Sequence, residues 1–126
     1  MIIEIQINGR YKAQKEKLLP IFNIYLKRIK KTAKILAKIY TVKLPGTLIL
    51  RPLYTKNGNN DYYGRLLHDN CTGYQIAINL SLCPKLRDKG LEILDHECAH
   101  IIADLIKKDL GHGKMFWEIY KKCRNI

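Results

Sequence analysis

The amino-acid sequence predicts an α+β domain made of an N-terminal helix, a three-stranded antiparallel sheet, a second long helix and a closing helix. Apolar residues recur every three or four positions over residues 20–40 and again over 86–108, which is the period of an amphipathic helix. Between these helices, three short apolar segments are separated by turn-forming residues. The chain has 126 residues and is 47% hydrophobic, so we expect one domain over residues 1–126.

The elements follow from local patterns. Residues 2–7 alternate between apolar and polar side chains and end in Asn8-Gly9, which predicts a strand and a turn. We expect Pro20 in the first turn of the main helix, which continues to about Tyr40. Strands are predicted over 47–54, 62–67 and 74–80, and the turn residues between them favour an antiparallel meander. A helix over 86–108, bounded by Pro84 and Gly111, and a closing helix over 114–123 complete the chain.

The first helix after the sheet carries a His-Glu-x-x-His motif, formed by His96, Glu97 and His100. Two positions four apart on an α-helix lie on the same side, so both imidazoles can reach one tetrahedral metal ion. The carboxylate of Glu97 is then the expected general base for hydrolysis.

A catalytic zinc ion usually has three protein ligands and one exchangeable water, so a third ligand is required. His112 is our first candidate, because a helix break near residue 108 and the flanking glycines allow the chain to turn back toward His100. If His112 is only a turn residue, Glu118 would complete the site instead. Asp104 follows His100 by one turn and either orients its ring or lies on the exposed edge of the helix.

The two metal motifs carry a family resemblance. A His-Glu-x-x-His helix followed by Gly-His-Gly-Lys-Met-Phe-Trp at residues 111–117 resembles the SprT-like (Spartan-type) zinc metallopeptidase domains. Residues 63–65 (Tyr-Gly-Arg) and the last strand at 74–79 are similar to that family too. The resemblance covers about residues 20–124, which it implies are the core of the domain.

The resemblance implies a minimal zincin-like metallopeptidase fold that holds one Zn²⁺. It implies that His96, His100 and His112 are the zinc ligands and that Glu97 is the catalytic residue. It also implies protein substrates, which in some relatives are proteins bound to DNA. Many relatives continue into a cysteine-rich zinc element, and we expect no such C-terminal zinc ribbon in a chain that ends at Ile126.

Positive charge is concentrated near the N-terminus. The chain has 23 Lys and Arg against 11 Asp and Glu, and only Glu16 opposes the basic residues between Arg10 and Lys43. This field would attract DNA or RNA phosphates, although a lysine-rich solvated helix face explains the same composition. The candidate nucleic-acid-binding residues on the long helix are Lys27, Arg28, Lys30, Lys31, Lys34 and Lys38.

Other features bound the location of the protein and the roles of its remaining side chains. No apolar run approaches eighteen residues, and the cysteines lack metal-site spacing, so we expect no membrane span and reduced thiols in the cytoplasm. Phe116 and Trp117 are predicted to anchor the closing helix in the core, while Tyr74 and Tyr120 are candidates for stabilising an oxyanion. His68 is predicted to lie at the surface.

Two functions therefore remain open. The first is a zinc-dependent metallopeptidase that hydrolyses peptide bonds, including those of nucleic-acid-bound proteins. The alternative is a non-catalytic nucleic-acid-binding module in which zinc joins the two C-terminal helices. The sequence does not indicate the substrate or the oligomeric state.

Overall fold

The computed structural model describes residues 1–44, 46–53, 64–69, 73–79, 86–107 and 112–126. Its elements are β1 (Ile2–Ile5), the 3-10 helix η1 (Gly9–Gln14), α1 (Lys15–Tyr40), β2 (Thr47–Leu53), β3 (Gly64–Asp69), β4 (Gly73–Asn79), α2 (Leu86–Lys107) and α3 (Lys114–Arg124). The predicted boundaries Pro84 and Gly111 lie outside the described residues, as do the turns between the strands and the side chain of His68.

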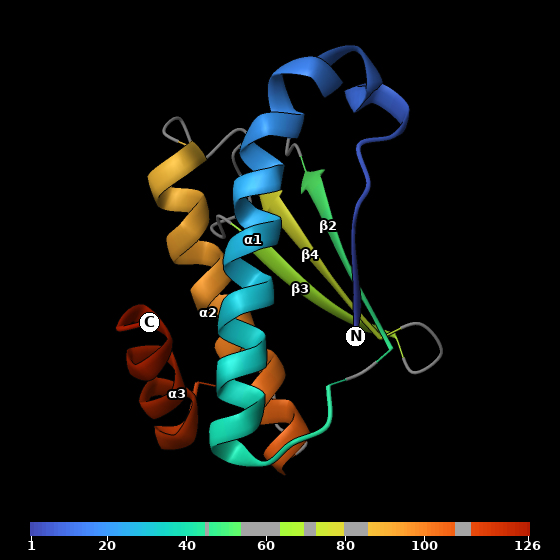
Figure 1. Cartoon of the computed structure of the whole chain (residues 1–126). Coiled ribbons are helices and arrows are strands. Elements are labelled where there is room, and N and C mark those ends of the chain that lie inside the picture. Colours follow the sequence, from blue (N-terminus) through green and yellow to red (C-terminus); the bar gives the residue numbers. More distant parts are fainter. Residues whose placement is uncertain (45, 54–63, 70–72, 80–85, 108–111) are drawn as a thin grey trace.

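The predicted three-stranded antiparallel sheet is wrong. The fold is α+β, and its sheet has four strands in the order β1-β2-β4-β3 (Figure 1). β1 pairs with β2 in parallel, β2 pairs with β4 in parallel, and β3 pairs with β4 antiparallel. The chain still alternates direction from β2 to β3 to β4, as a meander would, but β3 lies outside β4 instead of between the other two.

Burial explains this strand order. Tyr74, Ile76, Ala77 and Ile78 of β4 are all at most 2% exposed, and such a nearly continuous buried run is typical of a central strand with neighbours on both edges. β1 joins the sheet because α1 carries the chain back across it, and such a crossover is what parallel pairing requires.

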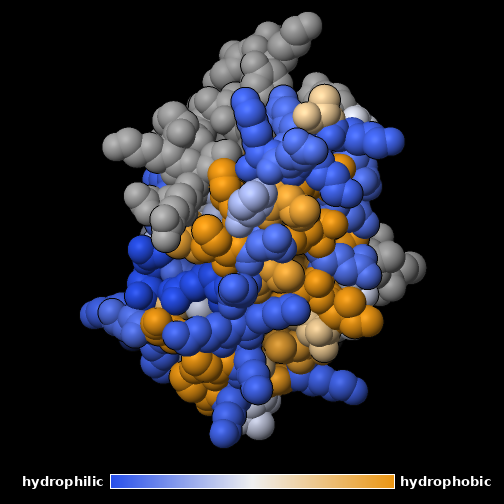
Figure 2. Space-filling view, turned by 45° about the horizontal axis from the view of Figure 1, so that its top comes forward, coloured by the Kyte–Doolittle hydropathy of each residue, from blue (hydrophilic) through white to orange (hydrophobic). Residues whose placement is uncertain are grey.

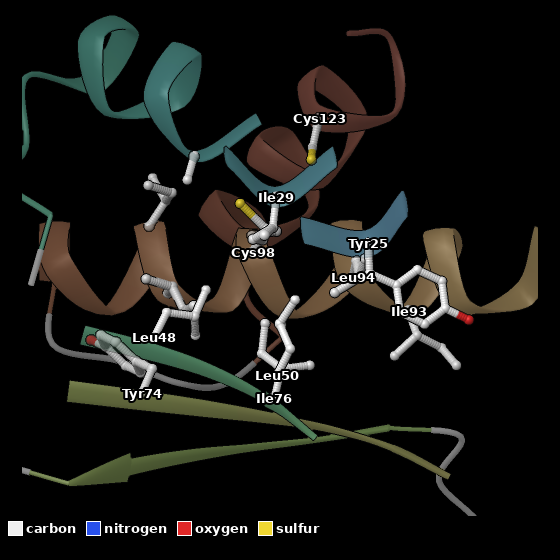
Figure 3. Packing of buried hydrophobic residues seen from close by; sticks show 14 of the residues in the cluster. Tyr25, Ile29, Leu48, Leu50, Tyr74, Ile76, Ile93, Leu94, Cys98 and Cys123 are labelled. Atoms are coloured by element: carbon white, nitrogen blue, oxygen red, sulfur yellow. The ribbon is translucent and has the colours of Figure 1, made fainter. Parts of the chain in front are cut away.

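Helices α1 and α2 form the layer that covers one face of the sheet. Inward side chains of the strands, including Leu48, Leu50 and Ile76, face α2 (Figure 3). Ile29 of α1 and Leu94 of α2 pack in the same buried cluster. α3 contacts α2 and α1, so the closing helix is attached to the helical layer.

Two local details refine the predicted elements. α1 begins at Lys15, so Pro20 lies in its second turn and not in its first. Gly90 of α2 lies so close to α1 that an added Cβ would be 1.9 Å from the hydroxyl oxygen of Tyr25.

Among the described residues, no helix is both long and apolar enough to cross a membrane.

Candidate metal centre

His96, Glu97 and His100 lie in the middle of α2, as predicted. The rings of His96 and His100 are 4.8 Å apart between centroids, so both project from the same side of the helix. Leu94, Cys98 and Ile102, on the opposite side, are at most 1% exposed and fix the rotation of α2 against the core. The apolar stripe therefore presents the two histidines together.

His112 joins them just before α3 begins. Its Nε2 atom is 2.9 Å from Nε2 of His100, and its ring centroid is 5.1 Å from that of His96. One ligand atom from each of the three residues lies within 4.8 Å of the other two. The expected convergence of His112 on the two helix histidines is confirmed, and we call these three residues the histidine cluster.

The geometry of the histidine cluster suits a tetrahedral zinc ion. Imidazole nitrogens bound to Zn²⁺ at 2.0–2.1 Å in tetrahedral directions are about 3.3 Å apart. The closest pair in the cluster, at 2.9 Å, is near this separation, and the widest does not exceed 4.8 Å. Glu118, the alternative third ligand, is not part of the cluster; its carboxylate lies 3.6 Å from Nζ of Lys122.

Glu97 lies beside the cluster. Its side chain is 8% exposed, and Oε1 is 3.2 Å from Nδ1 of His96. When Nδ1 donates its hydrogen to Glu97, Nε2 of His96 keeps the lone pair that a metal ion requires. The sequence thus brings a carboxylate and three imidazoles into one site.

Phe116 forms the floor of the site. It is 1% exposed, its ring stacks on His100 at 4.3 Å between centroids, and the rings of His96 and His112 lie at 5.0 and 4.8 Å. Its predicted role as a core anchor is confirmed. Trp117 was predicted to share that role, and this is wrong because its side chain is 53% exposed. Successive helix positions differ by about 100°, so the residue after Phe116 points away from the buried face.

The two candidate tyrosines have different surroundings. Tyr74 is 2% exposed and donates its hydroxyl hydrogen to Oδ2 of Asp104, and burial together with that bond raises the pKa of Tyr74. Tyr120 lies 5.9 Å from His96 between ring centroids, and burial raises its pKa, so it keeps a hydrogen to donate at neutral pH. Tyr120 is thus the better placed of the two. The predicted contact of Asp104 with His100 stays a prediction.

Arg28 is one of the predicted nucleic-acid-binding residues, but its guanidinium is bound within the protein. Its guanidinium donates to both carboxylate oxygens of Asp95, at 3.0 and 2.9 Å, and to the backbone carbonyl oxygens of Cys123 and Ile126 at 2.8 and 3.3 Å. Arg124 donates to Asp95 as well, at 2.8 Å. The bond to Asp95 is the main cause that raises the pKa of Arg28.

Sequence reasoning missed this Asp95 cluster, which joins α1, α2 and α3 directly beside His96. The side chain of Asp95 is 1% exposed, so its charge is compensated by the two arginines. Arg28 stands among lysines on α1, and the preference of arginine for two-pronged carboxylate contacts was the available signal.

The remaining basic residues of α1 do face solvent. At about 100° per residue they fall within about 100° of arc, opposite the buried stripe of α1. We call them the lysine stripe: Lys27, Lys30, Lys31, Lys34 and Lys38, all exposed. Figure 2 shows one face of the molecule, on which hydrophilic side chains project beyond the hydrophobic ones between them.

Cys98 and Cys123 are free thiols and are buried, which agrees with the prediction of reduced cysteines for these two; Cys71 and Cys83 lie outside the described residues. The hydroxyl of Thr32 lies 3.7 Å from Sγ of Cys98, and this contact connects α1 to α2.

Comparison of the chain with protein families, with curated proteins and with solved structures gives no match.

Proposed function

We propose that this protein is a zinc-dependent metallopeptidase of the SprT-like type. The observation that carries the proposal is the convergence of His96, His100 and His112 beside the carboxylate of Glu97. Three imidazoles leave one position of a tetrahedral ion for water, which is the arrangement of catalytic zinc and not of closed structural zinc.

The ligands and the base have distinct roles. The three histidines would hold Zn²⁺, which when bound supplies the Lewis acidity that activates water and polarises a peptide carbonyl. Glu97 takes the proton of the attacking water as the new C–O bond forms. It then gives that proton to the nitrogen of the leaving amine as the C–N bond breaks. Tyr120 is the side chain that we expect to donate to the oxyanion.

Strand β3 is the proposed platform for the substrate backbone. Among the described strands it pairs with β4 alone, and it contacts α2, the helix that carries two of the histidines. An extended peptide can add to such an edge through backbone hydrogen bonds, which gives affinity with little dependence on sequence. Protein substrates with locally unfolded segments fit this mode of binding.

Replacement of Glu97 by Gln tests the proposal. The purified wild-type protein should contain one zinc ion and cleave either itself or an unfolded protein such as casein. Glu97→Gln should keep the zinc and lose cleavage by about 10²-fold or more, because the base is removed and the ligands are not. Glu118→Gln is the matched control, since this exposed glutamate of α3 pairs only with Lys122 in the described contacts. Equal cleavage by the Glu97 variant and the control would refute the proposal.

The lysine stripe favours a second function, that of a nucleic-acid-binding module. Five exposed ammonium groups on one helix face repel one another unless a polyanion lies over them. Wild-type protein that binds zinc and DNA but cleaves no protein, with or without single-stranded DNA, would favour the module over the peptidase.

The free thiols of Cys98 and Cys123 support a reducing compartment, and we propose the cytoplasm.

A further inference from the structure

Trp117 is a large aromatic side chain that is left in solvent beside the histidine cluster. It is the one tryptophan of the chain and is 53% exposed, although α3 buries Phe116, Ile119 and Cys123 on its other side. Its ring centroid lies 6.0 Å from that of His112. An exposed tryptophan alone would mean little, but this one borders the proposed site of reaction.

Two aromatic neighbours hold the indole in place. The ring of Phe116 lies 5.0 Å away and that of Tyr120 lies 5.9 Å away, both edge to face. Trp117 therefore presents a fixed apolar surface, which costs little entropy when a second apolar group binds to it.

The charges around the indole are positive. Lys114 precedes Trp117 by three residues and Lys121 follows it by four, so both lie on the same face of α3 within one turn, and both are exposed. Glu118 is rotated by about 100° and pairs with Lys122 at 3.6 Å. A ligand that meets Trp117 is thus complementary if it carries acidic groups on either side of an apolar one.

We propose that Trp117 is a specificity-determining residue that selects protein segments in which an aromatic side chain is flanked by Asp or Glu. This inference rests on the proposed peptidase function. The indole centroid is 6.0 Å from that of His112, so a peptide bound across the histidine cluster would pass beside the indole. The aromatic residue of the substrate stacks on Trp117, and its acidic neighbours meet Lys114 and Lys121. A nucleobase would compete for the ring of Trp117. We expect the phosphate groups of a nucleic acid to bind the lysine stripe on α1 instead, which draws the nucleic acid away from Trp117.

Peptide binding to zinc-loaded Glu97→Gln tests the inference without cleavage. The probes are glycine-rich decapeptides that contain Asp-Phe-Asp, Asp-Ala-Asp or Lys-Phe-Lys, together with oligo(dT). Titration calorimetry gives the affinity, and the emission of the single tryptophan reports contact at Trp117. We expect the Asp-Phe-Asp peptide to bind about tenfold more tightly than either other peptide and to shift the emission.

Variants in the same background separate the ring from the charges. Trp117→Ala should reduce the preference for Phe over Ala to less than about twofold, Trp117→Phe should restore much of it, and zinc content should not change. Exchange of Lys114 and Lys121 for Glu should reverse the preference toward the Lys-Phe-Lys peptide. Ile39→Ala is the matched control, because Ile39 is 52% exposed on α1 and its loss should change nothing.

The possible failures are distinguishable. An equal preference in Trp117→Ala, or emission that responds to oligo(dT) and to no peptide, would overturn the inference. If wild-type protein cleaves proteins without this preference, the peptidase proposal stands and the inference falls. If the preference is found but wild-type protein cleaves nothing, the peptidase proposal falls and the peptide-binding surface stands.

Discussion

The guanidinium of Arg28 should be one of the largest single contributors to stability outside the apolar core. It makes two bonds to the buried carboxylate of Asp95, at 3.0 and 2.9 Å, and two to carbonyl oxygens at the end of the chain. Arg28→Ala leaves Asp95, whose side chain is 1% exposed, with Arg124 as its remaining positively charged partner among the described residues. Breaking a buried charge pair from one side costs about 3–5 kcal/mol, and we expect about 3–4 because Arg124 stays.

Three further substitutions calibrate this figure. Arg28→Lys keeps the charge but cannot reproduce the two-pronged contact, so it should lose about 1.5–3 kcal/mol. Arg124→Ala should lose about 1 kcal/mol or less, because the side chain of Arg124 is 43% exposed. Lys27→Ala, an exposed neighbour on α1, should stay within about 0.5 kcal/mol of wild type.

Urea unfolding followed by circular dichroism measures these free energies, with zinc at the same excess for every variant so that its contribution is common to all. If Arg28→Ala lies within 1 kcal/mol of wild type, or if Arg28→Lys is as stable as wild type, the guanidinium is not a buried anchor. DNA affinity supplies the complementary result. It should be unchanged in folded Arg28→Ala, because a side chain that contacts no phosphate contributes nothing to the salt-dependent binding.

Three other predictions follow from the structure. Gly90→Ala should lower the unfolding free energy by about 1–3 kcal/mol, because its Cβ would lie 1.9 Å from the hydroxyl oxygen of Tyr25; a thermal melt at or above that of wild type would contradict the close packing. Removal of zinc by a chelator should lower the melting temperature of wild type, in line with about 4 kcal/mol at a thousandfold excess over Kd, and should lower that of His112→Ala less, in line with about 2.7 kcal/mol or less when zinc binds at least about tenfold more weakly. Replacement of four residues of the lysine stripe by Ser should reduce the slope of log K against log salt for duplex DNA by about 3–4, and an unchanged slope would place the contact elsewhere.

The helices and the histidine cluster could be predicted from sequence because both depend on short-range patterns. The three- and four-residue period fixes which side of α2 faces the core, and His96 and His100 follow from it. The return of His112 could be anticipated from the helix geometry and the neighbouring glycines. By contrast, the sequence pattern predicts that both adjacent aromatic residues, Phe116 and Trp117, lie in the core. The structure buries Phe116 and exposes Trp117, because the rotation of α3 about its axis turns only one of them toward the core.

The sheet and the Asp95 cluster could not be predicted, because they depend on pairings between distant residues. Turn residues indicate that the chain reverses, but they do not indicate that β2 pairs with β4 while β3 takes the edge. Arg28 and Asp95 are 67 residues apart, and nothing local distinguishes this arginine from the lysines beside it except its side-chain chemistry.

Zinc binding by the histidine cluster is tested most directly by measuring the bound metal and its ligands. Metal analysis should give one zinc ion per chain, and absorption fine structure at the zinc edge should show three imidazole nitrogens at about 2.0–2.1 Å. His112→Ala should lose one of those nitrogens and bind zinc at least about tenfold more weakly, while Glu118→Gln should match wild type. Wild-type protein that binds no zinc, or an unchanged spectrum in His112→Ala, would contradict the account.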